Sequence, residues 1–233
     1  MIPSRRRDDP YLLIVGMTGV KLGDRIVQIG CAHGGRLGAV AAKVGLSGRA
    51  VAVVPDEPSA AQARKGASQA GALVEVEVAP PSSLPLEAGA FDLALVDDTG
   101  GLLAAQQPDA RAALTKEAFR VLKPGGRLAV SDVIVRGTVP DDIRRNVELW
   151  IGCVAGALEE SEYRDKLRTA GFESIDVEPW RVYDIDAARE FLVGAGLDVE
   201  AMVPVVKDKF ASAFIRARKP AAQTCCGPEC CAA

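Results

Sequence analysis

The 233-residue sequence predicts an α/β fold in which a mostly parallel β-sheet carries helices on both faces. Three observations support this prediction. Short apolar segments alternate with segments of helical periodicity along most of the chain. The apolar segments are nearly continuous in their hydrophobicity, which is typical of strands buried on both faces. A glycine-rich turn follows the first apolar segment and leads directly into a helical pattern.

The strands of the first half are predicted where apolar runs are bounded by glycine, proline or acidic residues. These runs occupy residues 25–30, 49–54, 73–78, 91–97 and 127–134. Helical periodicity fills the intervals at residues 36–45, 57–70 and 109–122. We expect the last of these helices to stop at Leu122, because the following sequence, Lys123-Pro124-Gly125-Gly126, combines proline and glycine as helix breakers.

The pattern changes after residue 136. A helix is predicted at residues 140–156, since Asp141 and Asp142 suit a helix N-terminus. The remaining predicted elements are a helix at 159–170, a strand at 174–179, a helix at 185–194 and a strand at 208–217. We therefore divide the chain into a lead-in with a short helix at 10–19 (1–22), a core (23–136), a C-terminal part with substrate-side helices and the final strands (137–219), and a flexible cysteine-rich tail (220–233).

Composition and charge narrow the class of protein. Hydrophobic residues make up 48% of the chain and charged residues 25%, enough apolar material for a buried core. The net charge of −3 argues against a nucleic-acid partner. The sequence contains neither a long apolar span nor an apolar leader, so we expect no membrane segment and a cytoplasmic location. Six cysteines in such a chain favour redox or soft-metal chemistry over disulfides.

The glycine-rich loop at residues 30–35, within the stretch VQIGCAHGGRLG (27–38), has two interpretations. Backbone amides at the start of the following helix would suit an anionic or polar cofactor, but a tight strand-to-helix turn explains the glycines equally well. His33 is either a ligand or proton carrier, or an ordinary surface residue. Asp97 and Asp98 end the fourth strand, where they either bind a cation or amine or cap the turn that follows.

Two longer stretches carry a family resemblance. The segments FDLALVD (91–97) and FRVLKPGGRLAVSDVI (119–134), together with the glycine turn, resemble the class I S-adenosylmethionine-dependent methyltransferases. The segment GCVAGA (152–157) and the tail CCGPECC look like those of the bacterial arsenite methyltransferases. The resemblance implies a Rossmann-like sheet with an antiparallel last strand and a small C-terminal cap. It also implies in-line methyl transfer to arsenite, with a thiol reductant as a further partner.

The resemblance also implies the site residues. The residues implied to hold S-adenosylmethionine are Gln28, Gly30, Cys31, Ala32, Gly34, Asp56, Glu57 and Asp97. Cys153 is implied to be the catalytic thiol that holds arsenite. The candidate ligands for As(III) or a soft metal are Cys153, Cys31, Cys225, Cys226, Cys230 and Cys231. Soft thiolates suit a soft metalloid, and because its lone pair attacks the methyl group, the protein's task is mainly to position two reactants.

Several positions depart from the family pattern. Gln28 stands where the family has an acid, and Pro55 and Pro80 replace two further acids that contact the cofactor, with Asp56 one place after Pro55. Two alternatives therefore stay open. The chain is either a catalytically lapsed methyltransferase-fold protein that binds As(III) or another thiophilic ion, or a methyltransferase for a different small molecule held near Asp97 and Asp98.

Overall fold

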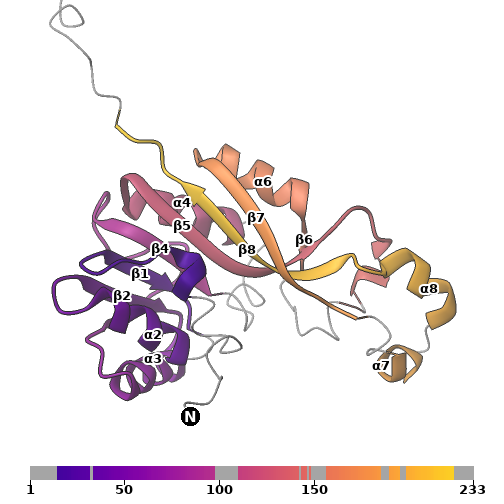
Figure 1. Cartoon of the computed structure of the whole chain (residues 1–233), viewed down its shortest axis with the longest axis horizontal. Helices are drawn as coiled ribbons and strands as arrows, with labels where there is room; N and C mark the ends of the chain where they lie inside the picture. Colours follow the sequence, from indigo (N-terminus) through magenta and orange to yellow (C-terminus); the bar gives the residue numbers. More distant parts are fainter. Residues whose placement is uncertain are drawn as a thin grey trace, which may run out of the picture.

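The computed structural model describes the main body of the chain (Figure 1). The described residues are 15–31, 34–97, 110–141, 143–145, 147, 156–184, 189–194 and 198–222. The predicted lead-in helix falls within this description only at its end, where residues 15–18 are helical. Of the helix predicted at 140–156, the described residues 141, 143–145 and 147 are helical.

Among the described residues, eight strands form one sheet, and seven of them follow the order β3-β2-β1-β4-β5-β8-β7, with β6 paired to β5. The strands are β1 (Arg25–Ile29), β2 (Arg49–Val54), β3 (Glu75–Val78), β4 (Phe91–Asp97), β5 (Leu122–Val135), β6 (Leu158–Glu159), β7 (Glu173–Val182) and β8 (Phe210–Arg218). β1 to β6 pair in parallel, and β8 runs antiparallel to both of its neighbours. This confirms the predicted α/β class and the antiparallel last strand.

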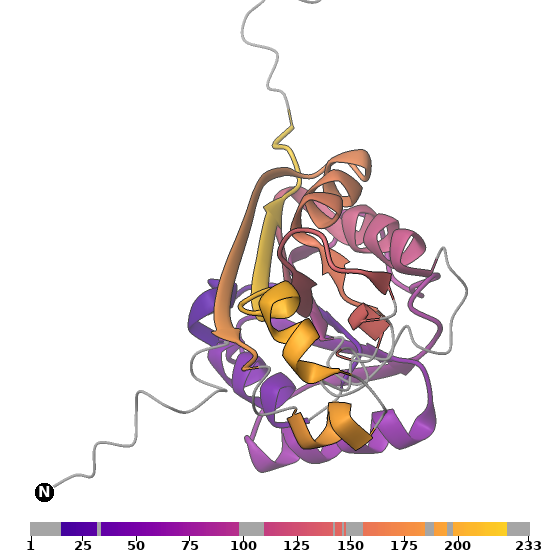
Figure 2. The ribbon, with the colours of Figure 1, turned by 90° about the vertical axis from the view of Figure 1, so that its right-hand side faces the viewer.

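Helices cover both faces of this sheet (Figure 2). The helices are α2 (Gly34–Val44), α3 (Glu57–Gln69), α4 (Ala110–Val121), α6 (Glu160–Thr169), α7 (Arg189–Gly194) and α8 (Val199–Val206). α2, α3 and the turn at 15–18 pack on one face, while α4 and α6 pack on the other. A smaller apolar cluster joins α8 to the outer ends of β5 and β8, which forms a cap at one end of the molecule (Figure 1).

Some predicted boundaries are wrong, and the structure gives the reasons. The turn Lys123–Gly126 lies inside β5, because Gly125 adopts a φ of 77° and the turn bonds to Lys219 after β8. β3 begins at Glu75, and β7 extends to Val182 because β8 continues to pair with it. The sequence did not suggest α8, whose internal Pro204 breaks the helical pattern. None of the described helices is long and apolar enough to cross a membrane.

Three glycines allow α2 and α3 to pack at very short range. A Cβ added to Gly34 would stand 2.2 Å from the Gln62 carbonyl oxygen, and one added to Gly66 would stand 2.0 Å from the Gly34 carbonyl oxygen. A Cβ on Gly38 would meet the Gly66 carbonyl oxygen at 2.5 Å. The structure thus gives Gly34, predicted as a cofactor contact, a packing role that its place in the turn did not reveal.

We expect Gly66→Ala to lower the free energy of unfolding by about 1–3 kcal/mol, because the added methyl group meets backbone atoms and the helices must separate. Urea denaturation of both proteins measures the change. Gly71→Ala is an instructive comparison, since a Cβ there has open space and only the positive φ of 62° opposes it. An unchanged midpoint for Gly66→Ala would contradict the close packing of α2 and α3.

Candidate functional site

The candidate site lies where β1 and β4 end. The strand order runs from β1 to β3 on one side and from β4 to β5 on the other, so the sheet reverses its direction of winding between β1 and β4. Ligands of open α/β sheets bind outside the carboxyl ends of the strands at such a point. Gln28 and Gly30 come from the end of β1 and Asp97 from the end of β4, and Gln28 lies opposite Leu95 in the register.

An ion pair between Asp97 and Arg36 is the main charged feature of this end of the sheet. Arg36 of α2 donates from Nη1 to Oδ1 of Asp97 over 2.7 Å. The Asp97 side chain is 7% exposed and that of Arg36 is 17% exposed, so both charges are largely withdrawn from water. With Gln28, both residues border a cavity of about 20 Å³, room for little more than a water molecule. The sequence indicated Asp97 but gave no sign of Arg36.

Gln28 stabilises the turn that follows β1. Its side chain is 2% exposed and donates from Nε2 to the Gly30 carbonyl oxygen over 3.2 Å. Gly30 itself has a φ of 81°, and its amide donates to the Val53 carbonyl oxygen over 2.8 Å. Glycine is required here because other residues rarely adopt this backbone conformation. The Gln28 amide is therefore used to shape the turn, which is a role the family pattern did not indicate.

Asp56 and Glu57 lie at the start of α3, at the carboxyl end of β2. Asp56 is the N-cap residue, and its Oδ1 accepts a 2.8 Å hydrogen bond from the Ser59 amide. This contact with Ser59 lowers the pKa of the Asp56 carboxyl, so it stays ionised near neutral pH. Glu57 pairs with Arg64 along the helix. The role of Asp56 and Glu57 as cofactor contacts thus stays a prediction. In the structure Asp56 caps α3, and Glu57 pairs with Arg64.

Cys31 lies in an apolar cluster and not in open solvent. It is 6% exposed and packs with residues of α2, α3 and β2, which are Leu37, Ala52, Val54, Ala60 and Ala63. Burial, with a smaller contribution from the Asp97 charge, raises the pKa of its thiol to about 11. A protonated thiol is a poor ligand for a soft metalloid, because the thiolate is the binding form. This environment favours a small packing residue over an arsenic ligand.

We expect Cys31 to react with iodoacetamide about a hundred-fold more slowly at pH 8 than an ordinary exposed thiol, because its pKa of about 11 leaves little thiolate. A variant with Cys153 and the four tail cysteines replaced by serine isolates this thiol, and the same protein in urea is the control. Because the pKa of Cys31 is raised on folding, its protonated thiol contributes to the free energy of unfolding below pH 9, and this contribution is lost as pH rises through 11. Fast native-state alkylation would contradict the burial.

A second buried charge lies on the opposite face of the sheet, at Asp132 of β5. Its Oδ2 accepts from Arg111 Nη1 over 2.5 Å and from the Tyr163 hydroxyl over 3.3 Å, and its Oδ1 accepts from the Val133 amide over 2.8 Å. Arg111 also donates to the Gly156 carbonyl oxygen over 3.1 Å. Burial raises the pKa of the Asp132 carboxyl, against the opposing effect of Arg111. This network connects β5, α4 and α6 to the chain that follows Cys153.

Several predicted site residues lie outside the described residues. These are Ala32, His33, Asp98, Cys153, Cys225, Cys226, Cys230 and Cys231. Their roles remain predictions. Within the described part of the chain, no group of three or more histidine, cysteine or acidic residues is arranged to hold a metal ion.

Comparisons with known proteins agree with this geometry. The sequence profile described as a methyltransferase domain matches residues 26–126. An arsenite methyltransferase of Halobacterium salinarum is 36% identical over 105 residues, which are 45% of this chain and 24% of the relative. The chain therefore spans only about a quarter of that relative's length.

Solved structures extend the similarity over most of the chain. An arsenic(III) S-adenosylmethionine methyltransferase from Chlamydomonas reinhardtii is 26% identical with a TM-score of 0.64, covering 89% of this chain and 67% of that one. A Bacillus halodurans protein of 19% identity shares the fold, with a TM-score of 0.68 and coverage of 91% of this chain and 99% of that one. The chain thus has the class I S-adenosylmethionine-dependent methyltransferase fold and is related to the arsenite methyltransferases.

Proposed function

We propose that this chain is an S-adenosylmethionine-dependent methyltransferase whose acceptor is arsenite held by cysteine thiols. The observation that carries the first part is the position of Asp97 and Arg36. They present a carboxylate and a guanidinium at the switch point between β1 and β4, beside the glycine turn. That is where a zwitterionic amino-acid group of a cofactor would find both of its charges matched.

The residues of the described site fit the cofactor at two places. Asp97 would hold the cofactor's ammonium group and Arg36 its carboxylate, while the positive φ of Gly30 lets the backbone approach closely. The ionised Asp56 carboxylate lies exposed at the end of β2 and would face the ribose. When bound, S-adenosylmethionine supplies an electrophilic methyl group on a sulfonium. The chain's own contribution is to bind and orient it and to exclude water.

The arsenite part of the proposal is supported by the relatives and by the sequence around Cys153. The Halobacterium and Chlamydomonas relatives are named for activity on arsenite or arsenic(III). Thiolates are the ligands that soft centres prefer, and Cys153 lies in the GCVAGA segment that resembles the family. We propose Cys153 and the tail cysteines as the thiols that hold As(III). The buried, protonated thiol of Cys31 supports no such role in the arrangement described.

A second candidate is binding of As(III) or another thiophilic ion without methyl transfer. Two local contacts favour it. The Gln28 side chain is bonded to Gly30, and the Asp56 side chain caps α3, so both predicted cofactor contacts already have partners within the chain. A fold alone does not fix an activity, and the loss of two hydrogen bonds to a charged ligand would weaken binding by about 3–6 kcal/mol if the effects added.

One set of measurements separates the two candidates. Calorimetry with S-adenosylmethionine at millimolar concentration tests cofactor binding, and chromatography with arsenic detection tests methylation of arsenite in the presence of a thiol reductant. We expect Cys153→Ser to lower arsenite affinity at least about ten-fold through loss of a soft ligand. Cys31→Ala, the matched variant, should leave arsenite affinity unchanged. No cofactor binding would exclude the methyltransferase, and arsenite binding without methylation would support the second candidate.

A further inference from the structure

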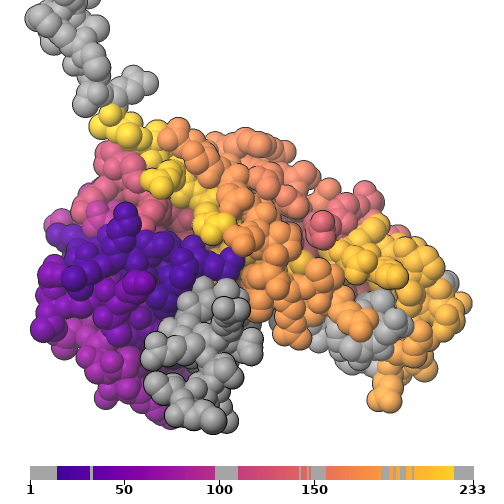
Figure 3. Space-filling view, in the orientation of Figure 1, coloured from indigo at the N-terminus to yellow at the C-terminus, as the bar shows by residue number. Residues whose placement is uncertain are grey.

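A cleft of about 700 Å³ opens at the end of the sheet opposite the candidate site. It lies where β1, β4 and β5 begin and β8 ends, beside the turn at residues 16–19. Ligand clefts commonly enclose about 300–1,000 Å³, so this cleft has room for a small organic molecule. Figure 3 shows the N-terminal residues of the described chain, in indigo, against the yellow and orange strands β8 and β7 that supply its other side.

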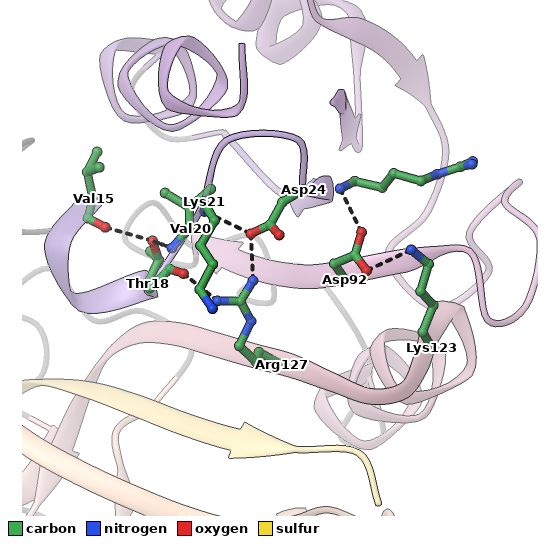
Figure 4. A network of polar contacts seen from close by, with 10 residues as sticks. Val15, Thr18, Val20, Lys21, Asp24, Asp92, Lys123 and Arg127 are labelled. Carbon is green, nitrogen blue, oxygen red and sulfur yellow. Dashed lines mark hydrogen bonds and ion pairs between the residues drawn. The ribbon is translucent and has the colours of Figure 1, made fainter. Parts of the chain in front are cut away.

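The acids of this cleft are all engaged. Each carboxylate that lines it binds one of the lining cations. Two of them, Asp24 and Asp92, also accept a hydrogen bond from a backbone amide, as Figure 4 shows. The pairs are Arg127 with Asp24, Lys123 with Asp92 and Arg216 with Asp176, over 2.5, 2.6 and 2.5 Å. The amides belong to Lys21, on Asp24, and to Arg25, on Asp92. The acids are thus neutralised by the protein itself.

Two further cations line the cleft and form no ion pair with a described residue. Lys21 and Arg218 are both exposed and both line the cleft. No ion pair joins Lys21 Nζ or the Arg218 guanidinium to another residue in the part of the chain that the structure describes. The residues that line the cleft include five cationic and three acidic side chains, so the net charge of the lining is positive. A positive lining favours an anion and not a metal ion as the ligand.

The arginines are also arranged in an unusual way. Arg127 of β5 lies directly opposite Arg218 of β8 in the antiparallel register, and Arg216 lies two residues along on the same face. Like charges directly opposite each other destabilise a sheet unless something compensates them. Asp24 compensates Arg127, and Glu173 of β7 lies opposite Arg218 in the register, although no described acid forms an ion pair with Arg218. Arginine forks match the oxygens of a phosphate group, so an anion of this kind suits the exposed guanidinium of Arg218.

We propose that this cleft binds a small molecule carrying more than one phosphate charge, with Lys21 and Arg218 as its main contacts. Arg127 and Arg216 lie on the same face of the sheet, where Asp24 binds the first and Asp176 and Glu178 bind the second. The cleft is open at two glycines, because a Cβ added to Gly16 or to Gly125 would meet nothing within 4 Å. Gln28, Arg36 and Asp97 do not line it, so the phosphate ligand binds without competing for the candidate cofactor site.

Calorimetric titration of the full chain with pyrophosphate tests the proposal. The double variant Lys21→Gln/Arg218→Gln should bind pyrophosphate about ten-fold more weakly or worse, the effect of losing a charge-assisted hydrogen bond. The control Lys43→Gln/Lys65→Gln removes the same charge from exposed positions on α2 and α3, and should bind within about two-fold of the native chain. Both replaced cleft side chains are exposed, so thermal unfolding should show that the double variant folds normally.

The outcomes are distinct. The proposal is supported if pyrophosphate affinity falls in the Lys21→Gln/Arg218→Gln variant and not in the control variant, and if S-adenosylhomocysteine leaves pyrophosphate affinity unchanged. Absence of heat at millimolar pyrophosphate overturns the proposal. An equal fall in pyrophosphate affinity in both double variants also overturns it, because it would indicate a general attraction of the anion to positive charge. Competition by S-adenosylhomocysteine would place the phosphate in the other site and also overturn it. Citrate binding as tightly as pyrophosphate would overturn the assignment to phosphate. None of these results depends on whether the chain methylates arsenite.

Discussion

Replacing Arg111 with methionine should lower the free energy of unfolding by about 3–5 kcal/mol at pH 7, the cost of leaving a buried charge without its partner. The Asp132 side chain is 5% exposed and that of Arg111 is 15% exposed, and the two are joined over 2.5 Å. Methionine fills similar space but supplies no charge. The Tyr163 hydroxyl, at 3.3 Å, would remain as a weaker partner of the same carboxylate oxygen.

Urea denaturation measures this loss, and Arg168→Met is the surface control. Arg168 pairs with Asp165 on α6, with both side chains more than half exposed, and such pairs contribute at most about 1 kcal/mol. The pH dependence supplies a second check. Burial already raises the pKa of Asp132, so the variant should regain stability relative to the native chain as pH falls and the carboxyl takes up a proton. A loss below about 1 kcal/mol at pH 7 would contradict the buried pair.

The sheet could be predicted from the sequence because its central strands are buried on both faces. The runs at 49–54 and 91–97 are nearly continuous in apolar residues, and the structure places β2 and β4 at those positions. Such runs report burial without any knowledge of the partner strand. The boundaries failed where a long-range pairing decided them. β5 includes the turn at Lys123–Gly126 because of Lys219, which lies far along the chain.

Of the buried charged residues, the sequence predicted only some. Asp97 was visible because an acid at the end of an apolar strand is conspicuous. Arg36 and Arg111 were not, because each lies in a helix where a cation usually faces water. Their burial follows from the way α2 and α4 pack on opposite faces of the sheet, which no local pattern encodes.

The turn after β1 shows the same limit in another form. Its glycines were visible in the sequence, but their roles separate only in three dimensions. Gly30 is required by its positive φ, whereas Gly34 is required by contact with Gly66 on a different helix. Cys31 looked like a thiol at the mouth of the site, but the chain directs it toward the apolar contacts of α2 and α3. The residue types were enough to identify the turn, but the role of each residue in it depends on packing contacts with other elements.

Replacing Asp97 with asparagine should weaken S-adenosylmethionine binding by about ten- to a hundred-fold, the effect of one hydrogen bond to a charged group. Asparagine keeps the shape and one acceptor oxygen but loses the negative charge. The change also removes the charge of the 2.7 Å ion pair with Arg36, so the carboxylate that would attract the cofactor's ammonium group is lost. Calorimetry measures the affinity, and Asp165→Asn on the exposed face of α6 is the matched control.

The pairing of Asp97 with Arg36 makes this prediction testable in a further way. If the lost affinity came only from Asp97 as a hydrogen-bond acceptor, removing Arg36 as well would weaken binding further. If Arg36 serves only to balance the charge of Asp97, the double variant Asp97→Asn/Arg36→Gln should bind the cofactor no more weakly than the single variant. Arsenite affinity should stay unchanged in both variants, because neither residue is a thiol. Cofactor affinity within two-fold of the native value in Asp97→Asn would remove Asp97 from the cofactor site, and with it the observation on which the methyltransferase proposal rests.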